Sequence, residues 1–303
     1  MRVLRAALVL IVVMIAAVWA YAQLTSDDTT SQTFGDGLRT FPTSASTKVR
    51  LSPDATRLAF VQDGALSIVR IRDGAILTRA GKNVVDAAWM PDGSRVLIDE
   101  GPIPTGQVAV INSSGRVAGV ANLKPSIAFG NGAGLAVNDD GTRAAAIAVS
   151  RDAIGGQAHN DLAIIDLQSG AVRIYSTPDQ DEDTPVFVDD ETVAVSSTGA
   201  SVGASPTPRL HVVTIATGKV DDRGAIEGGP FVTTPAAEVV VSRAAIADSR
   251  RLVALDLTTG TERVLADLAP NRQPLAVDSR TTRMVVRVSE DGGDGRITVD
   301  PIT

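Results

Sequence analysis

The side chains that could do chemistry in this chain are mostly carboxylates, and they gather in polar segments at residues 99–106, 150–161, 177–183 and 289–295. Carboxylates that converge could bind Ca²⁺ or a basic partner, because hard cations take several oxygen ligands. Carboxylates that stay apart would form a solvated rim instead. The acidic candidates for a partner-binding surface are Asp99, Glu100, Asp152, Asp161, Asp179, Asp181, Glu182, Asp183, Glu290, Asp291 and Asp294.

The densest acidic run, residues 179–183, resembles the first half of a calcium-binding loop. Asp179, Asp181 and Asp183 are its candidate metal ligands. Thr184 stands where the sharp turn of such a loop needs glycine, and Pro185 follows. No helical pattern flanks the run, so we predict no EF-hand and no cofactor, and we keep Ca²⁺ open as a ligand.

The chain has two histidines, and their surroundings differ. His159 lies in the polar segment 150–161, which we predict to be a long loop, seven residues after Asp152, and it could act there as an acid, a base, a ligand or a partner contact. His211 lies in an alternating apolar strand and shares a face with Val213 and Ile215. We therefore expect His211 in the core and count only His159 among the candidate site residues.

Residues 199–203 match the nucleophile pattern G-x-S-x-G, with Ser201 as the serine. That motif needs a strand before the serine and a helix after it. Here Pro206 and Pro208 follow within a Ser- and Ala-rich stretch, which indicates a loop. We predict no catalytic residue from this match.

The elements that must position these residues are two interleaved strand-turn-strand repeats. One repeat occurs at residues 51–61, 90–98 and 138–148, with divergent copies at 188–196 and 277–288. The other occurs at residues 66–77, 108–119, 162–174, 210–221 and 252–264. Each copy is a hairpin pattern, and one hairpin of each kind gives a four-stranded unit of roughly 40 to 50 residues. Units of this size are typical of propeller blades.

The units begin near residues 47, 84, 127, 184, 229 and 273. We predict an all-β chain forming a single β-propeller of about six four-stranded blades, with five or seven left open. Ala55 replaces the usual turn glycine, and the fifth unit lacks the Asp-Gly pair altogether. The last unit has three clear strands, so a strand within residues 37–45 could complete its sheet and close the ring.

Aligned turns place an apolar residue before each turn and an arginine after most of them. Leu51, Trp89, Val137, Phe187 and Val277 form the apolar set, which we expect to pack between adjacent blades. Arg57, Arg95, Arg143 and Arg283 form the basic set. We predict a structural role for these arginines, as donors to carbonyls and carboxylates of turns or neighbouring blades.

The N-terminus combines Arg2 and Arg5, an apolar run over residues 6–20, and the small-x-small sequence Ala20-Tyr21-Ala22. This pattern is typical of an export signal. Residues 1–22 are either a signal peptide cleaved after Ala22 or an anchor whose residues 6–22 hold the protein in the cytoplasmic membrane. Both readings predict an extracytoplasmic protein, with residues 23–45 as a polar tether and residues 46–303 as the propeller.

Composition excludes several classes of site. The chain has no cysteine, so it has no disulfide, thiolate metal site or cysteine nucleophile. Its net charge is −7, and loss of residues 1–22 removes two of the 28 basic residues and none of the 35 acidic ones, which leaves −9. This acidic balance argues against nucleic acid and anionic membranes as partners.

The turn sequences SPDATRLAFV (52–61) and MPDGSRVLI (90–98) resemble the repeat of TolB-like and WD-repeat-like β-propellers of exported bacterial proteins. The resemblance covers about 85% of the chain and implies the fold, with partner binding as the habit of the family. The long polar segments belong to the end of the propeller opposite the motif turns. We therefore expect a non-catalytic module that binds a protein, a peptide or an envelope component through its acidic loop face. A basic protein or peptide would complement the charge of that face. An enzyme acting on a sugar or peptide is the alternative, and a purely structural module is a third.

Overall fold

The computed structural model describes residues 41–42, 48–80, 84–100, 107–112, 117–121, 128–129, 134–151, 158–176, 182–197, 207–246, 249–289 and 296–302. The predicted signal or anchor and most of the predicted tether lie outside these residues. The described part of the chain contains no helix that is long and apolar enough to cross a membrane.

The described strands form antiparallel sheets that follow one another along the chain. The first sheet contains β2 (Lys48–Leu51), β3 (Arg57–Gln62), β4 (Ala65–Arg70) and β5 (Ile76–Ala80). The second contains β6 (Val84–Trp89), β7 (Arg95–Glu100), β8 (Gln107–Asn112) and β9 (Val117–Ala121). The third contains β10 (Ala128–Phe129), β11 (Leu135–Val137), β12 (Arg143–Arg151), β13 (Ala158–Asp166) and β14 (Val172–Tyr175).

The second half of the chain repeats this arrangement. The fourth sheet contains β15 (Glu182–Asp189), β16 (Thr192–Ser197), β17 (Arg209–Thr214) and β18 (Lys219–Ala225). The fifth contains β19 (Gly228–Thr233), β20 (Glu238–Ala244), β21 (Arg250–Asp256) and β22 (Glu262–Leu268). The sixth contains β23 (Arg272–Val277), β24 (Arg283–Val288), β25 (Arg296–Pro301) and β1 (Phe41–Pro42).

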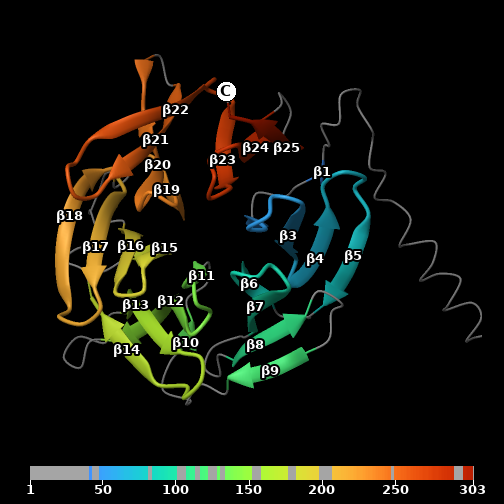
Figure 1. Ribbon diagram of the computed structural model, residues 1–303, viewed down its shortest axis with the longest axis vertical. Coiled ribbons are helices and arrows are strands. Elements are labelled where there is room, and N and C mark those ends of the chain that lie inside the picture. The colour runs from blue at the N-terminus through green and yellow to red at the C-terminus, as the bar shows by residue number, and fades with distance from the viewer. Residues whose placement is uncertain are drawn as a thin grey trace, which may run out of the picture.

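Among the described residues there are thus five sheets of four strands and one of five, arranged around a common axis as the blades of a propeller (Figure 1). The inner strands β2, β6, β11, β15, β19 and β23 contact one another in that order, and β23 contacts β2, so the ring closes. The predicted all-β propeller of about six blades is confirmed. The predicted unit starts agree with the observed first strands to within two residues in every blade.

The ring closes through a sheet made from both ends of the chain. In β1, Phe41 pairs with Ile297 and Pro42 pairs with Arg296, so the first described strand lies on the outer edge of β25. The sixth sheet therefore takes its fourth strand from within the range 37–45, and the folded unit begins before residue 46.

The core consists of hydrophobic clusters, each lying between two adjacent blades. One combines Ile68 and Leu66 of the first blade with Trp89 and Val96 of the second, and the corresponding clusters fill the other boundaries. Each residue of the predicted apolar set belongs to such a cluster or packs against it. A blade cannot bury its faces alone, so stability depends on its neighbours.

The motif turns share one backbone conformation in spite of their different sequences. Gly93 and Gly141 have φ of 65° and 73°, and Ala55, Ala237 and Thr281 adopt φ of 54°, 58° and 54° at the same turn position. Most residues with a β-carbon are strained in this left-handed region. The blade geometry therefore imposes the turn even where glycine is missing.

The arginines that follow these turns reach the turn of the next blade. The guanidinium of Arg57 donates to the carbonyl oxygen of Gly93 at 2.5 Å and lies 5.0 Å from the centroid of the Trp89 ring. Arg283 donates to the carbonyl of Ala55 at 3.2 Å. Arg143 makes the same kind of contact, described below, while the side chain of Arg95 lies outside the described part. The predicted structural role is confirmed for the three described side chains.

Candidate functional site

Strand direction divides the propeller into two faces. The turns that join the first and second strands of the blades, such as residues 52–56 and 138–142, lie on one end, which we call the turn face. The ends of the second strands and the beginnings of the first and third strands lie on the other end, which we call the loop face. The long polar segments begin and end at the loop face.

Several predicted site residues lie at strand ends on the loop face. Asp99 and Glu100 end β7, His159 lies next to the beginning of β13, and Glu182 and Asp183 begin β15. These strands belong to the second, third and fourth blades, which are consecutive in the ring. The topology thus brings five predicted residues to one end of three adjacent blades.

The predicted loop at residues 150–161 is shorter than expected, which corrects the setting of two candidates. His159 pairs with Ser150 and Asp161 pairs with Ala148 inside the β12–β13 ladder. Asp161 is only 2% exposed, because its strand continues to the loop face. His159 was predicted to lie in a loop, and that prediction is wrong: both strands extend beyond their apolar cores.

His211 lies in β17 and is 2% exposed, as its alternating sequence predicts. The remaining candidates lie outside the described residues: Asp152, Asp179, Asp181, Glu290, Asp291 and Asp294. The match around Ser201 lies there as well.

A pocket of about 250 Å³ opens on the loop face between the fourth, fifth and sixth blades. Its wall is polar and includes Thr184, Glu227, Ser242, Arg250 and Gln273. Thr184 directly follows the acidic beginning of β15, so the pocket adjoins Glu182 and Asp183 along the chain. The sequence did not predict this pocket, because its residues come from three blades and meet only when the blades close.

A larger cavity of about 500 Å³ lies on the propeller axis and reaches the turn face. All six inner strands or their following turns contribute to its lining, including Arg50, Trp89, Asp139, Phe231 and Asp278. Each inner strand pairs with one neighbour only, so its second backbone edge is directed away from its own sheet. The cavity can therefore offer backbone hydrogen-bonding groups as well as side chains.

Phe231, Gly229 and Thr184 line both spaces. The axial cavity and the loop-face pocket therefore lie back to back, with this group of residues between them. A ligand at one end would contact residues that also shape the other.

One charge interaction among the described residues at the axis is structural. The carboxylate of Asp86 is fully buried and accepts a hydrogen bond from Arg50 Nη2 at 2.7 Å, and Lys48 Nζ lies 3.8 Å away. The same carboxylate accepts from the backbone amides of Ala87 at 2.7 Å and Leu135 at 3.1 Å. The charge of Arg50 is therefore matched before any ligand arrives.

Asp278, which also lines the axial cavity, serves its own turn. Its carboxylate accepts hydrogen bonds from the amides of Thr282 and Arg283 at 2.8 and 2.6 Å, and from the Thr282 hydroxyl at 2.9 Å. Within the described ranges, no group of three or more histidine, aspartate and glutamate side chains is arranged to hold a metal ion.

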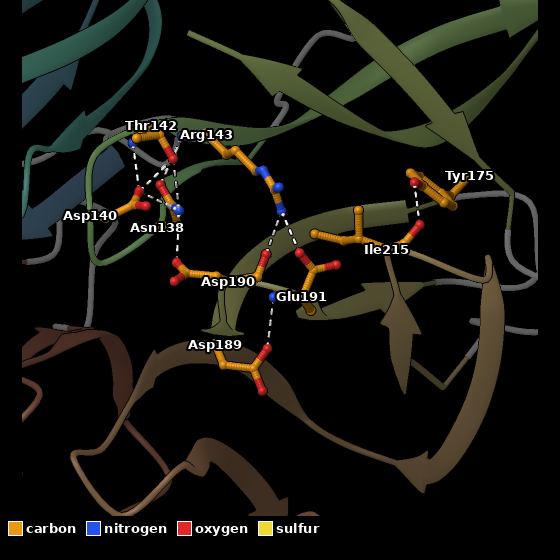
Figure 2. Close-up of polar contacts among 9 residues, drawn as sticks. All are labelled: Asn138, Asp140, Thr142, Arg143, Tyr175, Asp189, Asp190, Glu191 and Ile215. Carbon is orange, nitrogen blue, oxygen red and sulfur yellow. Dashed lines mark hydrogen bonds and ion pairs between the residues drawn. The ribbon is translucent and has the colours of Figure 1, made fainter. Parts of the chain in front are cut away.

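On the turn face, polar side chains connect the third and fourth blades (Figure 2). Arg143 Nη1 donates to the carbonyl oxygen of Asp190 at 2.7 Å and lies 3.2 Å from the Glu191 carboxylate. Asn138 donates to Asp140 at 2.7 Å and to Asp190 at 2.8 Å. Farther out, Tyr175 donates its hydroxyl to the carbonyl of Ile215 at 2.7 Å. These contacts fix the boundary between two blades.

The described arrangement can bind by charge and hydrogen bonding at the loop face and by backbone and apolar contacts at the axis. The loop-face pocket supplies hydroxyl, amide, carboxylate and guanidinium groups within one small space. Such a set recognises polar ligands or polar protein segments.

No protein-family model matches the chain, and a search of curated proteins finds no match. Solved structures match over most of its length. TolB from Acinetobacter baumannii has a TM-score of 0.52 at 12% identity, over 84% of this chain and 62% of that chain. A putative TolB from Agrobacterium tumefaciens has a TM-score of 0.53 at 15% identity, over 84% and 90% of the two chains.

Two further structures show how widely this architecture is shared. An oligogalacturonate lyase in complex with manganese has a TM-score of 0.56 at 11% identity, over 91% of this chain and 94% of the lyase. The RRP9 WD40 repeats have a TM-score of 0.54 at 8% identity, over 91% and 100%. Identities this low show the fold alone. The chain thus resembles TolB and WD40 β-propellers in structure, as its turn sequences predict.

Proposed function

We propose that this protein is a non-catalytic, extracytoplasmic binding propeller that recognises a basic protein or peptide segment, free or part of the cell envelope, through its loop face. The observation that carries the proposal is that the second and fourth blades both present acidic strand ends on the loop face, on either side of the third blade. Asp99 and Glu100 end β7, and Glu182 and Asp183 begin β15, at the same end of the molecule.

The neighbouring pocket supports this proposal. Its lining from the fourth to sixth blades offers hydroxyl and amide groups that can accept or donate hydrogen bonds to a polar segment. Glu227 adds a further carboxylate to this wall. A basic segment crossing the acidic strand ends would thus find hydrogen-bonding groups beside the charges.

Export follows from the N-terminal sequence. The basic start, the apolar run over residues 6–20 and the small residues at 20 and 22 are the features of an export signal. Cleavage would release the protein, and retention would leave residues 6–22 in the cytoplasmic membrane with the propeller outside.

An enzyme is the competing function, and the axial cavity is where its chemistry would have to take place. Two charged residues of that cavity already serve the fold, because Arg50 pairs with Asp86 and Asp278 holds its turn. Both side chains thus have a structural role, and we propose binding rather than catalysis. The manganese-bound lyase shares the fold and carries no further argument for this chain.

The test is a binding experiment with the full chain in detergent as bait and a cell-envelope extract as prey. The variant Glu182→Gln/Asp183→Asn removes two charges from the loop face, and Asp139→Asn/Glu191→Gln removes two from the turn face. We expect the first variant to retain much less of the partner that the wild type captures, with the loss growing in low salt. The second should capture the partner as the wild type does.

Equal capture by all three proteins would overturn the loop-face proposal. The enzyme would be supported instead if the purified chain cleaved a sugar or peptide substrate and substitutions at the axial cavity abolished that cleavage.

A further inference from the structure

A basic groove crosses the turn face where the ring closes, at the boundary between the sixth and first blades. It encloses about 880 Å³ and is lined by residues from both blades: Thr56, Arg57, Arg70, Ile71, Arg72, Leu77, Arg283, Val299, Asp300 and Pro301. Four of these are arginines, in a protein whose net charge is −7. The local charge of the groove is thus opposite to that of the whole chain.

The carboxylates near the groove do not neutralise its arginines. Asp73 lies between two of them, 2.6 Å from Arg70 Nη1 and 3.6 Å from Arg72 Nε. Asp54 lies 3.7 Å from Arg57, and Asp300 pairs with a fifth arginine, Arg272. Among the described residues, these five arginines contact three carboxylates, so the described part of the groove keeps two positive charges in excess.

The arginines also retain hydrogen-bonding capacity. A guanidinium has five N–H donors. Arg57 uses one donor, Nη2, on the carbonyl of Gly93, and Arg283 uses one, Nη1, on the carbonyl of Ala55. These contacts fix both side chains by their neighbours, while Arg72 is 79% exposed at the edge of the groove. Two guanidinium groups are thus held in place, and the third, Arg72, lies mostly in solvent with a 3.6 Å contact to Asp73.

Apolar side chains share the groove with the arginines. Leu77 is 38% exposed, while Ile71 and Val299 of the same wall are buried, at 6% and 8% exposed. A small inorganic anion would use only the charges and would leave most of this volume unfilled. An occupant that fits must carry carboxylates together with apolar side chains.

We propose that this groove binds an acidic peptide segment of a partner protein, with its carboxylates on the arginines and an apolar side chain on Leu77. A nucleic acid fits the charge of the groove but would approach a protein with a large negative net charge, which disfavours long polyanions. A short acidic peptide adds the apolar contacts and carries less charge. The site lies on the face opposite to the proposed acidic surface, so the two proposals are independent.

The probe is a fluorescein-labelled hexapeptide that alternates glutamate with leucine, titrated with the full chain in detergent and followed by fluorescence anisotropy. Matched hexapeptides replace glutamate by glutamine or by lysine. We expect binding of the glutamate peptide only, weakening as salt rises from about 0.05 M to about 0.5 M, because the contacts are between solvent-exposed charges.

The variant Arg70→Gln/Arg72→Gln should weaken binding at least about tenfold, since it removes charge-assisted contacts from the accessible side of the groove. Arg251→Gln/Arg263→Gln is the matched control: it removes two exposed arginines from the fifth blade, each paired with one carboxylate. This control should bind within about twofold of the wild type. Leu77→Ser should lower the affinity without changing its salt dependence.

Thermal unfolding checks that each variant is folded before its affinity is compared. Equal binding of the glutamate and glutamine peptides, or equal losses in both arginine variants, would overturn the proposal. So would tighter binding of a single-stranded oligonucleotide or of anionic vesicles in the same assay, because the groove would then serve a different class of ligand.

Discussion

The carboxylate of Asp86 and the guanidinium of Arg50 lie 2.7 Å apart across the boundary between the first and second blades. Asp86 is fully buried, and the same carboxylate accepts a hydrogen bond from the amide of Leu135 in the third blade. One side chain thus joins the inner strands of three consecutive blades.

Replacing Asp86 by alanine should therefore destabilise the protein by about 3 kcal/mol, because Arg50 would keep a partly buried charge without its partner and the Leu135 amide would lose its acceptor. Urea unfolding of the purified variant measures this change. Asp139→Asn, on the exposed turn face, is the control and should stay within about 0.5 kcal/mol of the wild type. A loss below about 1 kcal/mol for Asp86→Ala would contradict the role given to this pair.

The left-handed turns predict changes in stability of opposite sign for substitutions at two equivalent positions, Thr281 and Gly93. Thr281 has φ of 54°, a conformation that costs a β-branched residue more than glycine. Thr281→Gly should stabilise the protein by about 0.5 to 1 kcal/mol, after the entropy that glycine adds to the unfolded chain. Thermal unfolding against the wild type tests it, and a lower Tm would contradict it.

Gly93→Ala is the counterpart, because Gly93 has φ of 65°. A β-carbon there would also lie 3.1 Å from Arg57 Nη2, the group that bonds the Gly93 carbonyl. We expect a loss of about 1 to 2 kcal/mol from backbone strain. If both results are as expected, the left-handed conformation belongs to the turn in both blades, and only the residue that occupies it differs.

Much of the fold was predictable because its signal repeats. The turn sequences around Asp54, Asp92 and Asp140 recur at blade spacing, and the residues before and after each turn predicted the packing between blades and the role of the arginines. A sequence repeat identifies one blade. The ring follows because each blade must bury its two faces against neighbouring blades.

The candidate site was predictable only in part, because its residues do not repeat. Acidic residues at the ends of β7 and β15 were recognised from composition, and the topology brings them to one face. The loop-face pocket was missed, since Glu227, Arg250 and Gln273 are far apart in the sequence and meet through ring closure. The position of His159 within the β12–β13 ladder was missed as well. Both strands continue with polar residues beyond their apolar segments, and those polar residues indicate a loop in the sequence.

Acid should weaken the fold through the turn carboxylates. The hydroxyl of Thr142 donates to Asp140, and the backbone amide of Ser169 donates to Asp166, and these bonds hold the pKa of each carboxyl below its ordinary value of 3.8. A lowered pKa means that the folded state binds fewer protons than the unfolded state. The stabilisation is therefore complete above about pH 3.8 and is lost as the pH falls through the lowered pKa values.

The measurement is the urea midpoint between about pH 6 and about pH 2.5. We expect it to fall steeply at the acidic end for the wild type. Asp140→Asn/Asp166→Asn should begin from a lower midpoint at neutral pH and lose less of it on acidification. Parallel curves for the two proteins would show that these turns do not carry the acid sensitivity.

The two residue pairs between β1 and β25 give the last prediction. Phe41 and Pro42 cover part of the outer edge of the sixth sheet, and an uncovered strand edge pairs readily with other chains. A chain that begins at residue 46 should therefore melt at a lower temperature than one that begins at residue 23, and should self-associate in a concentration-dependent way. Light scattering and thermal unfolding of the two proteins test this directly. A third chain, beginning at residue 41, separates the contribution of the strand from that of the preceding residues: if it behaves like the chain from residue 46, the pairing of β1 is not what closes the ring.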